Sequence, residues 1–149
     1  MSKKSGFTLI ELVVVIMIIA ILGAVAIPRL LATRKSAMDS ASIQTLGSLR
    51  NAIAMYLAEN GGALPGSGGT QDGAQFKADV ELYIQGRFPK CPVGAGAGKE
   101  ADVLMTAADP FKGTSALDEG WAFNTDTGAF IVNFDGPTTI DPSKTYDEL

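Results

Sequence analysis

The chain has 149 residues, enough for one small domain but not for two. It contains no histidine and one cysteine, Cys91, so an internal disulfide is excluded and the commonest general base and metal ligand are missing. Its 12 Lys and Arg residues are outnumbered by 16 Asp and Glu, which argues against tight binding to nucleic-acid phosphates. We therefore expect no enzyme activity, no cofactor, no metal site and no nucleic-acid partner.

The N-terminal part of the chain is a long apolar stretch. Residues 7–27 read FTLIELVVVIMIIAILGAVAI and carry one charge, Glu11. As a helix this stretch would span about 32 Å, enough to cross a bilayer core. A secretory signal would place a small-residue cleavage site after the stretch, but Ile27 leads directly into Pro28 and more helix-forming sequence. A plain membrane anchor would have no use for Glu11, so we expect a helix that also serves another role.

A compact motif surrounds the start of this stretch. It reads Lys3-Lys4-Ser5-Gly6-Phe7-Thr8-Leu9-Ile10-Glu11-Leu12. With the sequence up to about residue 31, it resembles the processing signal of type IV prepilins and type II secretion pseudopilins. In that family a short basic leader precedes a Gly at the cut, a Phe becomes the new N-terminus, and a Glu follows four residues later. The resemblance implies that a prepilin peptidase cuts after Gly6 and methylates the amine of Phe7, while the apolar segment stays on the product.

The same resemblance implies a location and a set of partners. The leader would lie in the cytoplasm, and the rest of the chain outside a single-pass helix in the inner membrane. Membrane lipid would surround that helix before assembly. An assembly platform with its ATPase would then add the subunit to a homo-oligomeric helical filament, which is extracellular for a pilus and periplasmic for a pseudopilus.

Glu11 has a physical rationale within this scheme. Cleavage would create an ammonium group at Phe7, one helical turn from the Glu11 carboxylate. In a bundle of low dielectric constant, the ammonium of a neighbouring subunit could neutralise Glu11, and this pairing would set the axial register between subunits. The alternative is that Glu11 lies at the level of the lipid headgroups and pairs with nothing.

The helix should continue beyond the apolar stretch. Pro28 lacks an N–H and should kink or loosen it locally. Between residues 29 and 59 an apolar stripe recurs at steps of three and four residues: Leu46, Leu49, Ile53, Tyr56 and Leu57. Asn60, two glycines and then Pro65 should end the helix. We expect the stripe to pack on a C-terminal sheet.

The remaining residues should form a small antiparallel sheet. We predict a short helix at residues 78–88 and strands at 103–105, 120–123 and 129–134, with a hairpin loop at 124–128 that ends in Gly128. The fold class is thus α+β, with a long N-terminal helix packed on this sheet. Four segments are expected: a cleaved leader at 1–6, a transmembrane and polymerisation helix at 7–28, its amphipathic continuation at 29–59, and a globular body at 60–149.

Three functions remain in competition. The first is a structural subunit of a type IV pilus, and the alternative is the major pseudopilin of a type II secretion system. The third, a DNA-uptake pilin, would need an exposed basic patch, for which the candidates are Arg87, Lys90, Lys99 and Lys112. Oxygen ligands for calcium exist in principle, but they lack EF-hand spacing and read as scattered surface carboxylates: Asp118, Glu119, Asp126, Asp135 and Asp141.

Overall fold

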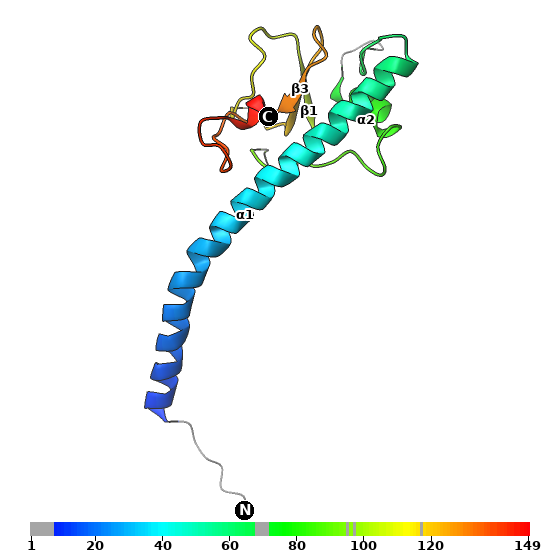
Figure 1. Cartoon of the computed structure of the whole chain (residues 1–149). Coiled ribbons are helices and arrows are strands. Elements are labelled where there is room, and N and C mark those ends of the chain that lie inside the picture. The colour runs from blue at the N-terminus through cyan, green and yellow to red at the C-terminus, as the bar shows by residue number, and fades with distance from the viewer. Residues whose placement is uncertain (1–7, 68–71, 95, 97, 117) are drawn as a thin grey trace, which may run out of the picture. The chain divides into compact units, whose positions relative to one another are not determined.

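The computed structural model describes residues 8–67, 72–94, 96, 98–116 and 118–149. The elements follow in the order α1 (Leu9–Glu59), α2 (Gly73–Glu81), β1 (Val103–Thr106), β2 (Trp121–Asn124), β3 (Phe130–Val132) and a short 3-10 turn, η1 (Tyr146–Glu148) (Figure 1). The chain divides into two compact units, residues 1–36 and 37–149, and α1 contributes to both.

The second unit is built around the apolar stripe of α1. Leu46, Leu49 and Ile53 are buried, while Tyr56 and Leu57 are half-buried at the end of the stripe. These side chains join a core that includes Phe76 of α2 and Trp121 of β2. The α+β arrangement predicted from the sequence, a long helix packed with a small sheet, is confirmed.

The sheet is mixed, not wholly antiparallel as predicted. β2 and β3 pair antiparallel, with Ala122 opposite Ile131, but β1 runs parallel to β2, with Leu104 opposite Ala122. Parallel neighbours need a crossover connection of about a dozen residues or more. The stretch between β1 and β2, residues 107–120, is long enough to provide one.

The hairpin between β2 and β3 forms as predicted. The Asn124 side chain accepts hydrogen bonds from the backbone of Asp126 at 2.9 Å and of Thr127 at 2.8 Å, which closes the turn. Gly128 follows with φ of 73°, a conformation that residues with a Cβ rarely adopt.

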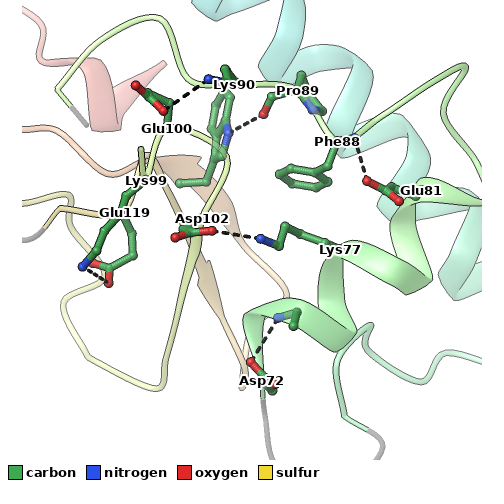
Figure 2. Close-up of polar contacts among 12 residues, drawn as sticks. Asp72, Lys77, Glu81, Phe88, Pro89, Lys90, Lys99, Glu100, Asp102 and Glu119 are labelled. Carbon is green, nitrogen blue, oxygen red and sulfur yellow. Dashed lines mark hydrogen bonds and ion pairs between the residues drawn. The ribbon is translucent and has the colours of Figure 1, made fainter. Parts of the chain in front are cut away.

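The second helix begins and ends earlier than predicted. It occupies Gly73–Glu81, whereas the sequence suggested residues 78–88. Asp72 acts as its N-cap and accepts a hydrogen bond from the Ala74 backbone at 3.0 Å, a signal hidden within a glycine-rich stretch. Beyond the helix, the Glu81 carboxylate accepts from the Phe88 backbone at 2.8 Å, so this acid fastens the following loop (Figure 2).

Polar contacts connect α2, the loop around Cys91 and the start of the sheet. Lys77 of α2 pairs with Asp102, just before β1, at 2.9 Å (Figure 2). The Trp121 indole N–H donates to the Pro89 carbonyl at 3.1 Å. The Cys91 backbone N–H donates to the Glu100 carbonyl at 2.7 Å. The Pro-Lys-Cys-Pro stretch is therefore bonded to Trp121 of the central strand β2 and to Glu100, which precedes β1.

Candidate assembly surfaces

The two residues expected at the processing site lie outside the described chain. Gly6 and Phe7 are not among the described residues, which begin at Thr8. At that point the backbone N–H and the hydroxyl of Thr8 donate to one Glu11 carboxylate oxygen at 2.8 and 2.7 Å, and the Glu11 backbone N–H lies 3.3 Å from the Thr8 hydroxyl oxygen. This reciprocal arrangement is a capping box at the start of α1.

Glu11 therefore has a partner within its own chain that the sequence analysis missed. The signal was present, because a Thr followed three residues later by Glu, ahead of an apolar run, is the sequence signature of a capping box. The carboxylate and its hydrogen bonds with Thr8 are exposed, so capping leaves Glu11 accessible to a further partner.

The first half of α1 presents an apolar surface that nothing in its own unit covers. None of residues 8–36 is buried, and the exposed side chains include Leu9, Val15, Ile19, Leu22 and Leu31. The helix is long and apolar enough to cross a membrane. A surface of this kind requires either lipid or other protein chains around it.

Pro28 lies inside this part of α1, and the helix is assigned without interruption on both sides of it. Because proline has no N–H, the carbonyl of Ala24 lacks its usual helical donor. The kink expected at Pro28 remains a prediction.

A buried carboxylate on α1 anchors the end of the chain. Asp39 is fully buried and accepts hydrogen bonds from the backbone N–H groups of Thr139 at 2.7 Å and Ile140 at 3.0 Å, and from the hydroxyls of Thr139 and Tyr146. We call residues 135–149 the C-terminal strap. It closes on itself through the Pro137–Thr145 bridge. Asp39 thus binds both limbs of the strap to α1.

The electrostatics of Asp39 follow from these contacts. Burial raises the pKa of its carboxyl, but the hydrogen bonds from Thr139, Tyr146 and Ile140 outweigh burial and hold the pKa below its ordinary value. Burial, together with the hydrogen bond to Asp39, raises the pKa of Tyr146 to about 12. At neutral pH the Asp39 carboxylate is therefore ionised and accepts a hydrogen bond from the neutral Tyr146 hydroxyl.

The sequence analysis did not identify Asp39, although its position along the helix indicates that it is buried. Residues 39 and 42 continue the three- and four-residue spacing of the apolar stripe backward along α1, and both Asp39 and Ser42 are buried. A carboxylate on the buried face of a helix must find hydrogen-bond donors. What the sequence alone does not reveal is that those donors lie a hundred residues away.

A second α1 side chain also binds the C-terminal part. The Arg50 guanidinium donates to the Phe130 carbonyl at 3.1 Å and to the Leu149 carbonyl at 2.8 Å. Burial lowers the pKa of Arg50. Together, Asp39 and Arg50 connect one helix with β3 and the strap.

The remaining candidate residues have ordinary structural surroundings. Burial raises the pKa of the Cys91 thiol to about 11, and its sulfur lies 3.2 Å from the Val93 carbonyl. Lys90 pairs with Glu100 at 3.5 Å and Lys99 with Asp118 at 3.4 Å, so two of the four cations considered for DNA binding are paired with acids. Among the described residues, no group of three or more Cys, Asp or Glu is placed to hold a metal ion.

Comparison with known proteins matches the N-terminal segment to a known sequence family. Residues 1–27 match the family described as the prokaryotic N-terminal methylation motif. The segment is of the prepilin type. This confirms the resemblance seen in the sequence, and it connects Glu11 and the exposed apolar helix to one segment of known kind.

Individual relatives are similar to part of the chain. The chain is 50% identical over 60 residues to the type IV wide pilus major component of Thermus thermophilus, covering 40% of this chain and 46% of the relative. It is 37% identical over 60 residues to the type II secretion system core protein G of Vibrio cholerae, covering 40% and 41%. It is 43% identical over 70 residues to the prepilin peptidase-dependent protein D of Escherichia coli, covering 47% and 48%.

These matches are partial in length. The matched part spans between about two fifths and one half of each of these relatives. No solved structure matches the chain.

Proposed function

We propose that this chain is a structural subunit of a type IV pilus-like filament, polymerised through the first half of α1. The observation that carries the proposal is an apolar helix surface that is left uncovered in its own unit and that lies largely within the matched N-terminal methylation motif. Other copies of the same helix would cover that surface in a filament, and lipid would cover it before assembly. The type IV wide pilus component and the protein D relative support this assignment.

Processing is part of the proposal. A prepilin peptidase cuts after Gly6 and methylates the new amine of Phe7, and the mature subunit waits in the inner membrane as a single-pass protein with its body outside. An inner-membrane platform with its ATPase then extracts it. Glu11 pairs with the amine of a neighbouring subunit in the filament, and Pro28 provides a local kink between residues 7–28 and the amphipathic part at 29–59.

The second candidate is the major pseudopilin of a type II secretion system. It is favoured by the similarity of this chain to the type II secretion system core protein G of several bacteria, including Vibrio cholerae and Escherichia coli. The lack of a disulfide in the body is compatible with both candidates. The location of the filament decides between them, because a pilus is recovered by shearing from the cell surface whereas a pseudopilus stays within the envelope.

Intact-mass measurement tests the processing step. The mature protein should begin at Phe7 and be heavier by one methyl group than the cleaved chain. Gly6→Val should leave a full-length precursor in the membrane and no filament, because the peptidase would lose the small residue at the cut. Recovery of assembled subunits that retain Met1 would contradict the proposal.

A further inference from the structure

The two units of the chain differ in the sign of their charge. Between residues 8 and 36 there are three cations, Arg29, Arg34 and Lys35, and one acid, Glu11. Residues 37–149 contain seven Lys and Arg against fifteen Asp and Glu. A chain with a basic segment and an acidic body can attract further copies of itself head to tail.

The three cations are available for a partner. Arg29, Arg34 and Lys35 are exposed, and none makes an ion pair with any described residue. Leu30 and Leu31 lie one turn before Arg34 and Lys35 on α1 and are 68% and 56% exposed. We call residues 29–35 the basic segment. Its surface combines apolar side chains with positive charge.

A groove lies beside the C-terminal strap, a segment in which acids outnumber cations. It has a volume of about 280 Å³ between α1 and the strap, and Ile43 and Ile140, 46% and 58% exposed, contribute to its lining. Asp141 and Lys144, one acid and one cation, line the same groove. The strap carries four acids and one cation, Lys144, and none of the four acids makes an ion pair within the described chain.

Hydrogen bonds from the strap to Asp39, and from Arg50 to the strap, hold the strap against α1 and so define the groove. The Asp39 hydrogen bonds to Thr139 and Ile140 hold the strap residues that form one wall. The opposite wall is α1 itself at Ile43. The apolar side chains and the charged groups of Asp141 and Lys144 are therefore presented in a fixed arrangement, which lowers the entropy lost on binding.

We propose that the groove beside the C-terminal strap of one copy binds the basic segment of a second copy. In this contact Leu30 and Leu31 pack against Ile43 and Ile140, while Arg34 and Lys35 approach Asp141 and the other strap acids. The contact joins different surfaces of two identical chains, and such heterologous contacts propagate into open helical filaments. This inference rests on the proposed filament and specifies which surfaces its subunits share.

A charge swap in the full-length chain tests the contact. Arg34→Glu with Lys35→Glu should reduce the protein recovered in sheared filaments about tenfold relative to the membrane pool, since like charges would then meet. Asp141→Lys should also lower recovery, and combining it with Lys35→Glu should restore much of the loss. Arg87→Glu is the matched control, because it changes the charge of another exposed cation outside both surfaces and should leave filaments unchanged.

Crosslinking tests proximity without changing any charge. Two tagged chains are co-expressed, one with Leu31→Cys and one with Ile140→Cys, and filaments are oxidised. We expect a disulfide between the two introduced cysteines, detected as a crosslinked species that carries both tags. The native Cys91 does not interfere because it is buried.

The outcomes separate this contact from the proposed function. If the unchanged chain forms no filaments, the filament proposal itself fails. If filaments form but the combined charge variants show only additive losses, and no crosslink joins the two tags, the docking contact is wrong. A third outcome is that the double variant Arg34→Glu with Lys35→Glu is depleted from the membrane, while the protein that remains there assembles normally. That outcome would overturn the docking contact and indicate that the basic segment binds anionic lipid headgroups.

Discussion

At the scale of single residues, Glu11 combines a charge with a capping geometry. Its carboxylate accepts two hydrogen bonds from Thr8, yet it stays exposed. A glutamine at this position could still cap the helix, because the capping box accepts Glu or Gln, but it would lack the charge. Substitutions at positions 8 and 11 therefore separate the two roles.

We predict that the charge of Glu11 serves assembly. Glu11→Val should insert and be processed, because Gly6 and Phe7 remain, but should yield few filaments. Glu11→Gln should be partly defective, and Thr8→Val, which removes the capping hydroxyl and keeps the carboxylate, should assemble nearly normally. The measurement is the ratio of sheared filament to processed membrane protein. A severe defect in Thr8→Val beside a normal Glu11→Gln would show that capping is the role of Glu11.

The second residue of interest is Asp39, which holds the strap against α1 through hydrogen bonds. Tyr146→Phe should lower the free energy of unfolding of the body by about 2 kcal/mol, because it removes a hydrogen bond to a charged group. Asp39→Asn should lower it more, because an amide offers one acceptor oxygen to several donors. Urea unfolding of a soluble form that starts at Arg29 measures both. Values equal to that of the unchanged chain would mean that the strap contributes nothing to stability.

The same carboxylate predicts a pH dependence. Because the pKa of Asp39 is lower in the folded chain than its ordinary value, the ionised form contributes stability above about pH 4, and this contribution disappears as the pH falls through the folded pKa. The difference in unfolding free energy between the unchanged body and Asp39→Asn should be constant near neutral pH and narrow below about pH 4. A difference that widens on acidification would contradict this assignment.

At the scale of elements, α1 contains two kinds of helix. Residues 12–27 are apolar on all sides, and the second half of the helix has one buried stripe that ends in the half-buried Tyr56 and Leu57. The stripe was predictable because its period follows directly from helix geometry. The position of α2 and the parallel pairing of β1 were not predictable, since the first depends on a single Asp72 cap and the second on which strands meet in space.

At the scale of the whole molecule, the body should fold without the apolar half of α1. None of the described residues before position 37 is buried, so a chain starting at Arg29 loses no core contact. We expect this truncation to be soluble and its circular dichroism to show mixed helix and strand. A further truncation that starts at Ile43 removes Asp39 and Ser42 and should melt at a lower temperature. An unfolded or wholly helical spectrum for the longer form would contradict the two-unit organisation.

Features that depend on neighbours along the chain could be predicted from the amino-acid sequence. A continuous apolar run, the motif around Gly6 and Glu11, the stripe at Leu46 and the turn at Gly128 are all set by local spacing or by one residue's conformational freedom. Contacts between groups that lie far apart in the chain became known from the folded structure. Asp39 receives its hydrogen bonds from a strap a hundred residues later, and β1 crosses over to pair parallel with β2. Such contacts depend on chain closure over long separations, which leaves no periodic signal in the sequence.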